Sequence, residues 1–133
     1  MGAAADGRGD IALAWFRAAV VYLLIAVALG VTMGAHSDFA MRSVHSHLNL
    51  LGWVSLALMG LIYQQLPQLG ARPLAKWQFR LHNCGLAGMA AGLAAKAHGL
   101  SSGDQLVGVG SIVLAVAVLI FALNILPARL PGD

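Results

Sequence analysis

Histidine is the residue type in this chain with the clearest capacity for chemistry. The chain has five histidines and a single cysteine, Cys84. One thiol can form neither an internal disulfide nor a cysteine-rich zinc site, so a bound metal would depend on imidazole nitrogens. Two of the histidines, His45 and His47, are separated by one residue within a mostly apolar segment, and they are the first candidates for a binding site.

The spacing of His45 and His47 indicates two sites rather than one. Each residue of an α-helix turns the side chain by about 100°, so these two imidazoles point about 200° apart, on nearly opposite faces. This disfavours a zinc site of the i, i+4 kind and a compact copper site built from this pair. The spacing instead favours two pockets, each completed by another helix or another subunit.

The composition places these histidines in a membrane. Of the 133 residues, 59% are hydrophobic and 10% are charged, whereas soluble domains average about 45–50% and about 25%. Too few polar side chains remain to cover a folded surface in water, and intrinsic disorder would require low hydrophobicity and high charge. The net charge of +3 is small, and we expect no binding to nucleic acid.

Four hydrophobic segments are long enough to cross a bilayer. About 20 residues cross roughly 30 Å of hydrocarbon, and segments of that kind lie at residues 13–35, 41–66, 77–98 and 105–126. Short connections make consecutive segments antiparallel neighbours. The sequence therefore predicts an all-α fold, an up-down bundle of four transmembrane helices in a single domain that covers residues 1–133.

The basic residues predict the orientation of this bundle. Cytoplasmic loops of membrane proteins carry an excess of Lys and Arg. Arg42 and Lys96 fall on one side of the predicted bundle, while six basic residues fall on the other side, namely Arg8, Arg17, Arg72, Lys76, Arg80 and Arg129. We therefore expect both termini in the cytoplasm. The first segment is longer than the apolar part of a signal peptide, so we expect it to be retained.

Four of the five histidines share one membrane level in this topology. His45 and His47 lie near the outer end of the second segment, while His36 and His98 lie at the outer ends of the first and third. Ionisable groups inside a bilayer cost about 2.5 kcal/mol or more and are functional candidates, although interfacial histidines can also simply bind water. His82 lies about 15 Å deeper, and we expect it to form an interhelical hydrogen bond.

Small residues in the segments indicate either helix packing or room for a cofactor. Arg42, Asn49 and Gly52 lie on the same helical face as His45, and the missing side chain of Gly52 leaves space there for a flat cofactor. Other small residues follow patterns typical of membrane helices that approach closely, namely Gly30-x-x-x-Gly34, Gly88-x-x-x-Gly92 and Gly108 with Gly110. The aromatic residues Trp15, Trp53, Trp77 and Tyr22 are expected to pack or to anchor the helices at the interface.

The second segment contains an ordered motif, His45-Ser-His47-x-x-Leu50-Leu-Gly52-Trp53, then Gly60-x-Ile62-Tyr63, then Pro67. This stretch, residues 45–67, resembles the tenth helix of subunit I in the haem-copper oxidase and nitric oxide reductase superfamily, closest to the C-type oxidases. In that family the first histidine of the His-x-His pair binds the high-spin haem and the second binds the low-spin haem. The whole chain also resembles small four-span bacterial proteins labelled oxidase-like.

This resemblance implies an architecture and a cofactor. Subunit I of the family consists of three arcs of four helices, so this chain is expected to correspond to one arc, and three copies would form a homotrimer in the inner membrane of a bacterium. The implied cofactor is haem b. Arg42 would either pair with a haem propionate or extend to the lipid headgroups, and His98 takes the position of a copper-ligating histidine pair.

The chain also departs from the family. It has no Trp-x-x-x-His-Pro-Glu motif, no candidate for a His–Tyr crosslink on the second segment, and no acidic residue within the four segments. These departures argue against oxygen reduction coupled to proton pumping.

Three functions remain open from the sequence. The first is a haem b protein for electron transfer or redox chemistry, with His47 of one subunit and His45 of the next as axial ligands. The second is non-haem copper or zinc binding by His36, His45, His47 and His98. The third is a structural or accessory subunit of a respiratory oxidase. The sequence identifies no electron donor and does not decide whether the chain is an enzyme.

Overall fold

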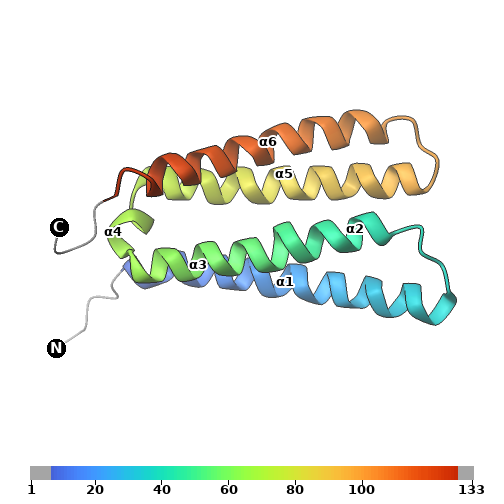
Figure 1. Ribbon diagram of the computed structural model, residues 1–133, viewed down its shortest axis with the longest axis horizontal. Helices are drawn as coiled ribbons and strands as arrows, with labels where there is room; N and C mark the ends of the chain where they lie inside the picture. The colour runs from blue at the N-terminus through green and yellow to red at the C-terminus, as the bar shows by residue number, and fades with distance from the viewer. Residues whose placement is uncertain (1–6, 129–133) are drawn as a thin grey trace.

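The computed structural model describes residues 7–128, which form helices and no strand (Figure 1). Arg129 lies outside these residues, and so does the side chain of Arg8, so their use in predicting the orientation is not addressed. In chain order the helices are α1 (Gly7–His36), α2 (Arg42–His47), η1 (Leu48–Val54), α3 (Ser55–Gln65), α4 (Pro67–Gly70), α5 (Pro73–Ala97) and α6 (Gly103–Ile125).

Three of these elements make one continuous helix. α2, η1 and α3 follow one another without a break, and η1 is a π-helical stretch between two α-helical ones. We call this unit, Arg42–Gln65, the interrupted rod. It corresponds to the predicted second segment, although the sequence did not predict its π-helical centre.

The other predicted segments match helices apart from their ends. α5 begins at Pro73 rather than at residue 77, because proline has the backbone φ of a helix and lacks only an N–H group that the first turn leaves unpaired. His36 is the last residue of α1, and His98 is the C-cap residue directly after α5.

The described part of the chain contains three helices that are long and apolar enough to cross a membrane. This identifies it as a membrane protein. α5 is not among the three, because polar residues such as Arg80, His82 and Asn83 interrupt its apolar sequence. The three candidate spans are Ala12–His36, Arg42–Gln65 and Gly103–Ile125.

The helices are arranged as two antiparallel pairs. In Figure 1, α1 lies beside the interrupted rod, and α5 lies beside α6. α1 begins and α6 ends at the end of the molecule where α4 lies, which we call the α4 end. The connections at residues 37–41 and 98–102 lie at the opposite end, the loop end.

Glycines bring the backbones of α5 and α6 together. A Cβ atom on Gly110 would lie 2.4 Å from the backbone nitrogen of Met89, and one on Gly85 would lie 2.6 Å from that of Leu114. Gly92 and Gly103 face each other in the same way. The predicted small-residue packing is therefore confirmed for Gly92 and Gly110, whereas a Cβ on Gly108 would meet nothing within 4 Å.

Glycines in the other pair accept rings instead. A Cβ on Gly52 of the rod would lie 2.6 Å from the Cβ of Tyr22, and one on Gly30 of α1 would lie 2.9 Å from Cε1 of His45. Gly34, the second glycine of the pattern in α1, has nothing within 4 Å of its Cβ position. In this pair of α1 and the interrupted rod, which we call the α1 pair, side chains and not backbone contacts separate the helices.

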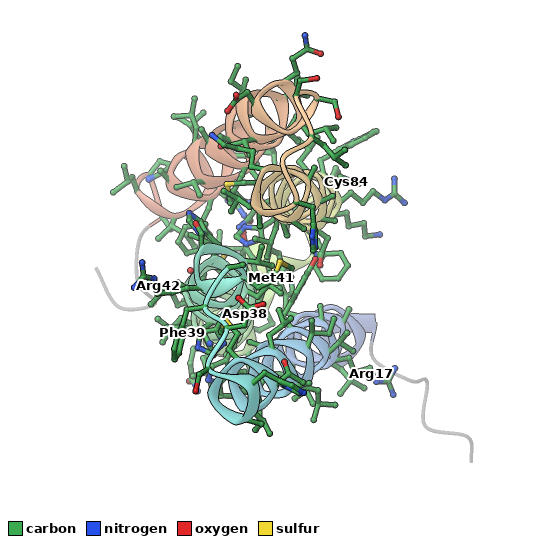
Figure 2. The ribbon with its side chains drawn as sticks, turned by 90° about the vertical axis from the view of Figure 1, so that its right-hand side faces the viewer. Arg17, Asp38, Phe39, Met41, Arg42 and Cys84 are labelled. Atoms are coloured by element: carbon green, nitrogen blue, oxygen red, sulfur yellow. The ribbon has the colours of Figure 1, made fainter. Side chains whose placement is uncertain are left out.

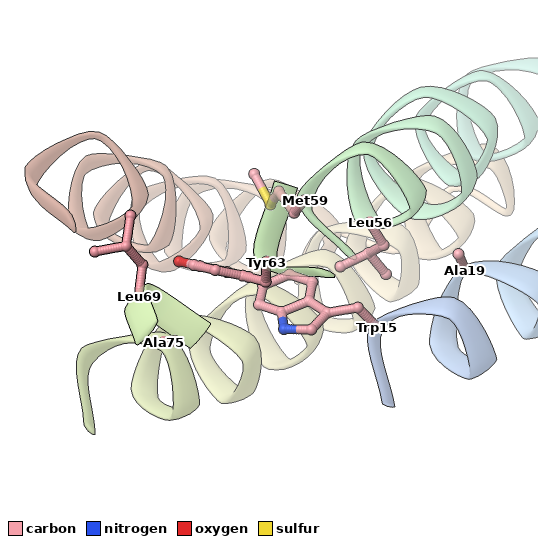
Figure 3. Packing of buried hydrophobic residues seen from close by; sticks show 7 residues of the cluster. All are labelled: Trp15, Ala19, Leu56, Met59, Tyr63, Leu69 and Ala75. Carbon is pink, nitrogen blue, oxygen red and sulfur yellow. The ribbon is translucent and has the colours of Figure 1, made fainter. Parts of the chain in front are cut away.

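The core toward the α4 end contains two buried aromatic rings, Trp15 and Tyr63, among smaller apolar residues (Figure 3). Trp15 is fully buried, so it packs in the core. Its ring lies 5.7 Å from the ring of Tyr63 and 5.0 Å from that of Phe79, measured between centroids. These contacts join α1 to both the interrupted rod and α5.

The turns after α1 and α5 have the same form. A residue just after each helix has a positive φ: Ser37, directly after α1, has 53°, and Gly99, directly after the C-cap of α5, has 76°. In both turns the backbone N–H groups that follow return to carbonyls of the last helical turn, as in a Schellman motif. Glycine adopts this conformation without strain, whereas serine does so at a cost.

Candidate histidine site on the interrupted rod

His45 is held between the interrupted rod and α1. Its Nδ1 lies 2.8 Å from the carbonyl oxygen of Ala26. A carbonyl can only accept a hydrogen bond, so Nδ1 carries the proton and Nε2 carries the lone pair. The glycine at position 30 makes room for the ring, as its Cβ position lies 2.9 Å from Cε1 of His45.

Asn49 and Gly52, predicted to share the face of His45, contact His45 itself or α1, within the same chain. The side-chain amide of Asn49 donates to Nε2 of His45 at 3.3 Å and to the His45 carbonyl at 3.1 Å. Both ring nitrogens of His45 are therefore occupied within one chain. The space beside Gly52, expected to admit a flat cofactor, is filled by Tyr22 of α1.

His47 lies on the other side of the rod. Its Nδ1–H donates to the carbonyl oxygen of Ser43 at 2.7 Å, which again leaves the lone pair on Nε2. No hydrogen bond to Nε2 occurs within the described residues. The half-buried ring lines a groove of about 280 Å³ with Ser46, Leu50 and Leu51. The two imidazoles thus serve different surroundings, as their spacing predicts.

The π-helical stretch lies directly beside this groove. Nε2–H of His82, a fully buried residue of α5, donates to the carbonyl oxygen of Leu51 at 2.8 Å. The hydroxyl of Ser55 donates to the carbonyl of Leu50 at 2.8 Å. The interhelical hydrogen bond expected of His82 is therefore confirmed. π-helical turns are rare and often occur at functional sites, which supports a role for this part of the rod.

A second polar cluster, near the α4 end, was not predicted. The Tyr63 hydroxyl donates to Oε1 of Gln78, and the Asn124 amide donates to the Tyr63 hydroxyl at 3.2 Å. The guanidinium of Arg72 donates to Oδ1 of Asn124 at 3.1 Å. Gln78 and Asn124 are fully buried, and their presence within apolar segments is the sequence signal that could have identified this cluster.

The outer histidines are not gathered around one centre. Within the described residues, no three His, Cys, Asp or Glu side chains are grouped so as to hold a metal. His45 faces α1, His47 faces the groove, and His98 is exposed in the connection after α5. The ligand set of His36, His45, His47 and His98 therefore gains no support, since its members belong to different sides of the bundle.

Arg42 begins the interrupted rod and is exposed at the loop end. Viewed along the bundle from that end, its side chain lies at the edge and extends away from the helices (Figure 2). This position suits contact with lipid headgroups or with an anionic group of a ligand, the two roles expected for it.

No protein-family model, curated protein or solved structure matches this chain.

Proposed function

We propose that this chain is an integral membrane protein that binds haem b through His47 and transfers electrons. One observation carries the proposal: His47 is fixed in the tautomer that leaves Nε2 free, and its ring lines an open groove. A histidine whose Nδ1–H is held by a carbonyl is oriented and made more basic for metal binding through Nε2. Bound haem would supply a one-electron carrier, and the chain supplies its ligand and an apolar surface.

The size of the groove favours a site shared between copies of the chain. Enclosed ligand pockets usually measure about 300–1,000 Å³, so an open groove of about 280 Å³ offers only part of an enclosure for a porphyrin. A neighbouring copy in a cyclic oligomer would cover the other face and repeat the site at each interface. The resemblance to one arc of an oxidase subunit favours a homotrimer.

His45 of a neighbouring copy is the proposed second axial ligand. Its Nδ1–H is also held by a carbonyl, so its Nε2 has the correct tautomer. The amide of Asn49 occupies that nitrogen at 3.3 Å within one chain. Haem binding at His45 therefore requires Asn49 to turn away, which makes Asn49 a residue that limits access to this ligand.

We further propose that α5 is a fourth transmembrane helix, so that the chain is a four-span bundle. Its buried polar residues, including Gln78 and His82, bond to neighbouring helices and so do not face lipid. The proposed orientation has both termini in the cytoplasm of a bacterium with the protein in its inner membrane. This orientation is supported by exposed basic residues toward the α4 end, namely Arg17, Arg72, Lys76 and Arg80.

The test is the absorption spectrum of the purified full chain in mild detergent, oxidised and then reduced. We expect a Soret band and a sharp α band on reduction. His47→Ala should abolish both, while His98→Ala, which changes an exposed histidine outside the groove, should retain them. Asn49→Leu should raise haem occupancy by freeing Nε2 of His45.

Other outcomes would contradict the proposal. A colourless wild-type protein that copurifies with copper or zinc would favour non-haem metal binding, and a colourless metal-free protein would favour a structural or accessory role. Unchanged bands in His47→Ala would show that haem is bound elsewhere. A chain that remains monomeric with haem bound would exclude the shared site.

A further inference from the structure

A second pocket lies at the loop end, between the last turn of α1 and the start of the interrupted rod. It measures about 160 Å³ and does not share a residue with the groove of His47. Two of its lining residues carry thioether sulfur, one carries an imidazole and one a carboxylate. The lining residues are Leu29, Thr32, Met33, His36, Asp38 and Met41.

The turn after α1 builds this pocket. With Ser37 at φ 53°, the backbone N–H of Asp38 returns to the carbonyl oxygen of Met33 at 3.2 Å. This hydrogen bond holds Asp38 next to the last turn of α1. In the view along the bundle, Asp38 and Met41 lie toward the middle, whereas Phe39 points outward (Figure 2).

His36 is oriented for ligation. Its Nδ1–H donates to the carbonyl oxygen of Thr32 at 2.9 Å, which leaves the lone pair on Nε2. The ring is exposed, so an ion can approach Nε2 without displacing a packed neighbour. A backbone carbonyl on the opposite nitrogen is the usual orienting partner of a metal-binding histidine.

The two methionine sulfurs of the pocket differ from those of the core. Met59 accepts a hydrogen bond from Gln78 at 3.3 Å, and Met89 accepts one from Ser111 at 3.2 Å. Within the described residues no hydrogen bond reaches the sulfur of Met33 or Met41. Met33 is 8% exposed and Met41 is half-buried, and both residues line the pocket.

We infer that this pocket binds one Cu(I) ion, with Sδ of Met33, Sδ of Met41 and Nε2 of His36 as ligands. The thioether donors select Cu(I), whereas Zn²⁺ prefers thiolate, imidazole and carboxylate ligands and Mg²⁺ and Ca²⁺ prefer oxygen ligands. The carboxylate of Asp38 adds the negative charge that favours a cation. The inference does not depend on haem binding, because the two sites have no residue in common.

The test is a titration of the purified full chain with Cu(I), using the chromogenic chelator bicinchoninate as competitor. The wild-type protein should withdraw one Cu(I) ion per chain from the chelator. Loss of a residue that only orients a metal ligand costs about 10–100-fold in affinity. Loss of a ligand itself should cost at least as much, so Met33→Leu and Met41→Leu should each lower the Cu(I) affinity by at least about tenfold. Leucine replaces methionine with nearly the same volume, so the fold is retained. Met59→Leu is the matched control and should bind as wild type does.

His47→Ala separates this site from the proposed haem site, because it should lose haem and keep Cu(I) binding. The inference is overturned if wild type withdraws no Cu(I), if both pocket variants bind as tightly as Met59→Leu, or if Zn²⁺ competes for the site at equal concentration. Retained haem in His47→Ala together with normal Cu(I) binding would contradict the proposed function alone.

Discussion

The two helix pairs use glycine in opposite ways. In α5 and α6 the glycines face backbone, with Gly85 opposite Gly110 and Gly92 opposite Gly103. In α1 and the interrupted rod each close glycine faces a ring, such as Tyr22 at Gly52. Backbone contact brings two helices to their closest approach and leaves little space for polar side chains. Packing by rings leaves room for an imidazole.

This difference separates a supporting pair from the pair that contains the proposed haem ligands. Both imidazoles of the His-x-His pair, the groove and the π-helical stretch belong to the interrupted rod. The α5–α6 pair supports that region with the hydrogen bond from His82 to the Leu51 carbonyl and with apolar packing of Leu86 against Leu48. The closely packed α5–α6 pair therefore contacts the irregular part of the other pair directly.

The largest expected effect is that of Gly110→Ala, which breaks the supporting pair. The new Cβ would lie 2.4 Å from the backbone nitrogen of Met89, and backbone cannot move aside as a side chain can. We expect the free energy of unfolding in bicelles to fall by about 2–3 kcal/mol.

Gly108→Ala is the matched control in the same helix. Its Cβ meets nothing within 4 Å, so the change should leave stability unaltered or raise it by up to about 1 kcal/mol through helix propensity. Equal destabilisation by both changes would show that the α5–α6 contact differs from the one described.

The next largest effect is expected at the contact between the pairs. His82→Phe keeps an aromatic ring beside Trp15, whose centroid lies 6.3 Å away, but removes the donor to the Leu51 carbonyl. Leaving a buried carbonyl unpaired should cost about 1–2 kcal/mol. His82→Gln places an amide donor at a similar reach and should recover part of the loss in the same unfolding measurement. If glutamine recovers nothing, ring packing and not the hydrogen bond stabilises this contact.

The sequence predicted the helices better than their contacts. Hydropathy and the helix-breaking residues between the segments located the four long helices of the described residues, because these signals depend on local residue types. The helical spacing of His45 and His47 correctly placed them on different sides of the rod. The glycine contacts were predicted in part. Gly92 and Gly110 of the predicted patterns make backbone contacts, whereas Gly108 meets nothing. Their partners Gly85 and Gly103 were not predicted, because the register depends on how α5 and α6 pack against each other.

Two features of the candidate site depend on tertiary structure in the same way. The π-helical stretch has no pattern of its own in the sequence, and its carbonyls bond to His82 and Ser55. The space at Gly52 was expected to admit a cofactor, whereas Tyr22, thirty residues earlier, fills it. The partner helix determines which side chain enters a gap beside a glycine. The sequence of the helix that carries the glycine therefore does not predict that side chain.

A smaller effect is expected from Gly30→Ala, which tests the ring-filled gaps of the α1 pair. Its Cβ would lie 2.9 Å from Cε1 of His45, and the imidazole can tilt to relieve the overlap. The loss of stability should be at most about 1 kcal/mol, at the lower end of overpacking effects. Gly34→Ala, with nothing within 4 Å, is the control. A loss as large as that of Gly110→Ala would remove the distinction between the two pairs.

The smallest effect concerns the two similar turns at the loop end, one in each pair. Ser37 holds φ at 53° and Gly99 holds it at 76°. A left-handed conformation costs a residue with a side chain about 1–2 kcal/mol, while glycine loses about 0.5–1 kcal/mol through unfolded-state entropy. Ser37→Gly should therefore raise the free energy of unfolding by less than about 1 kcal/mol, and Gly99→Ser should lower it by a similar amount. A loss of stability in Ser37→Gly would show that the serine side chain, and not its backbone strain, decides the stability of this turn.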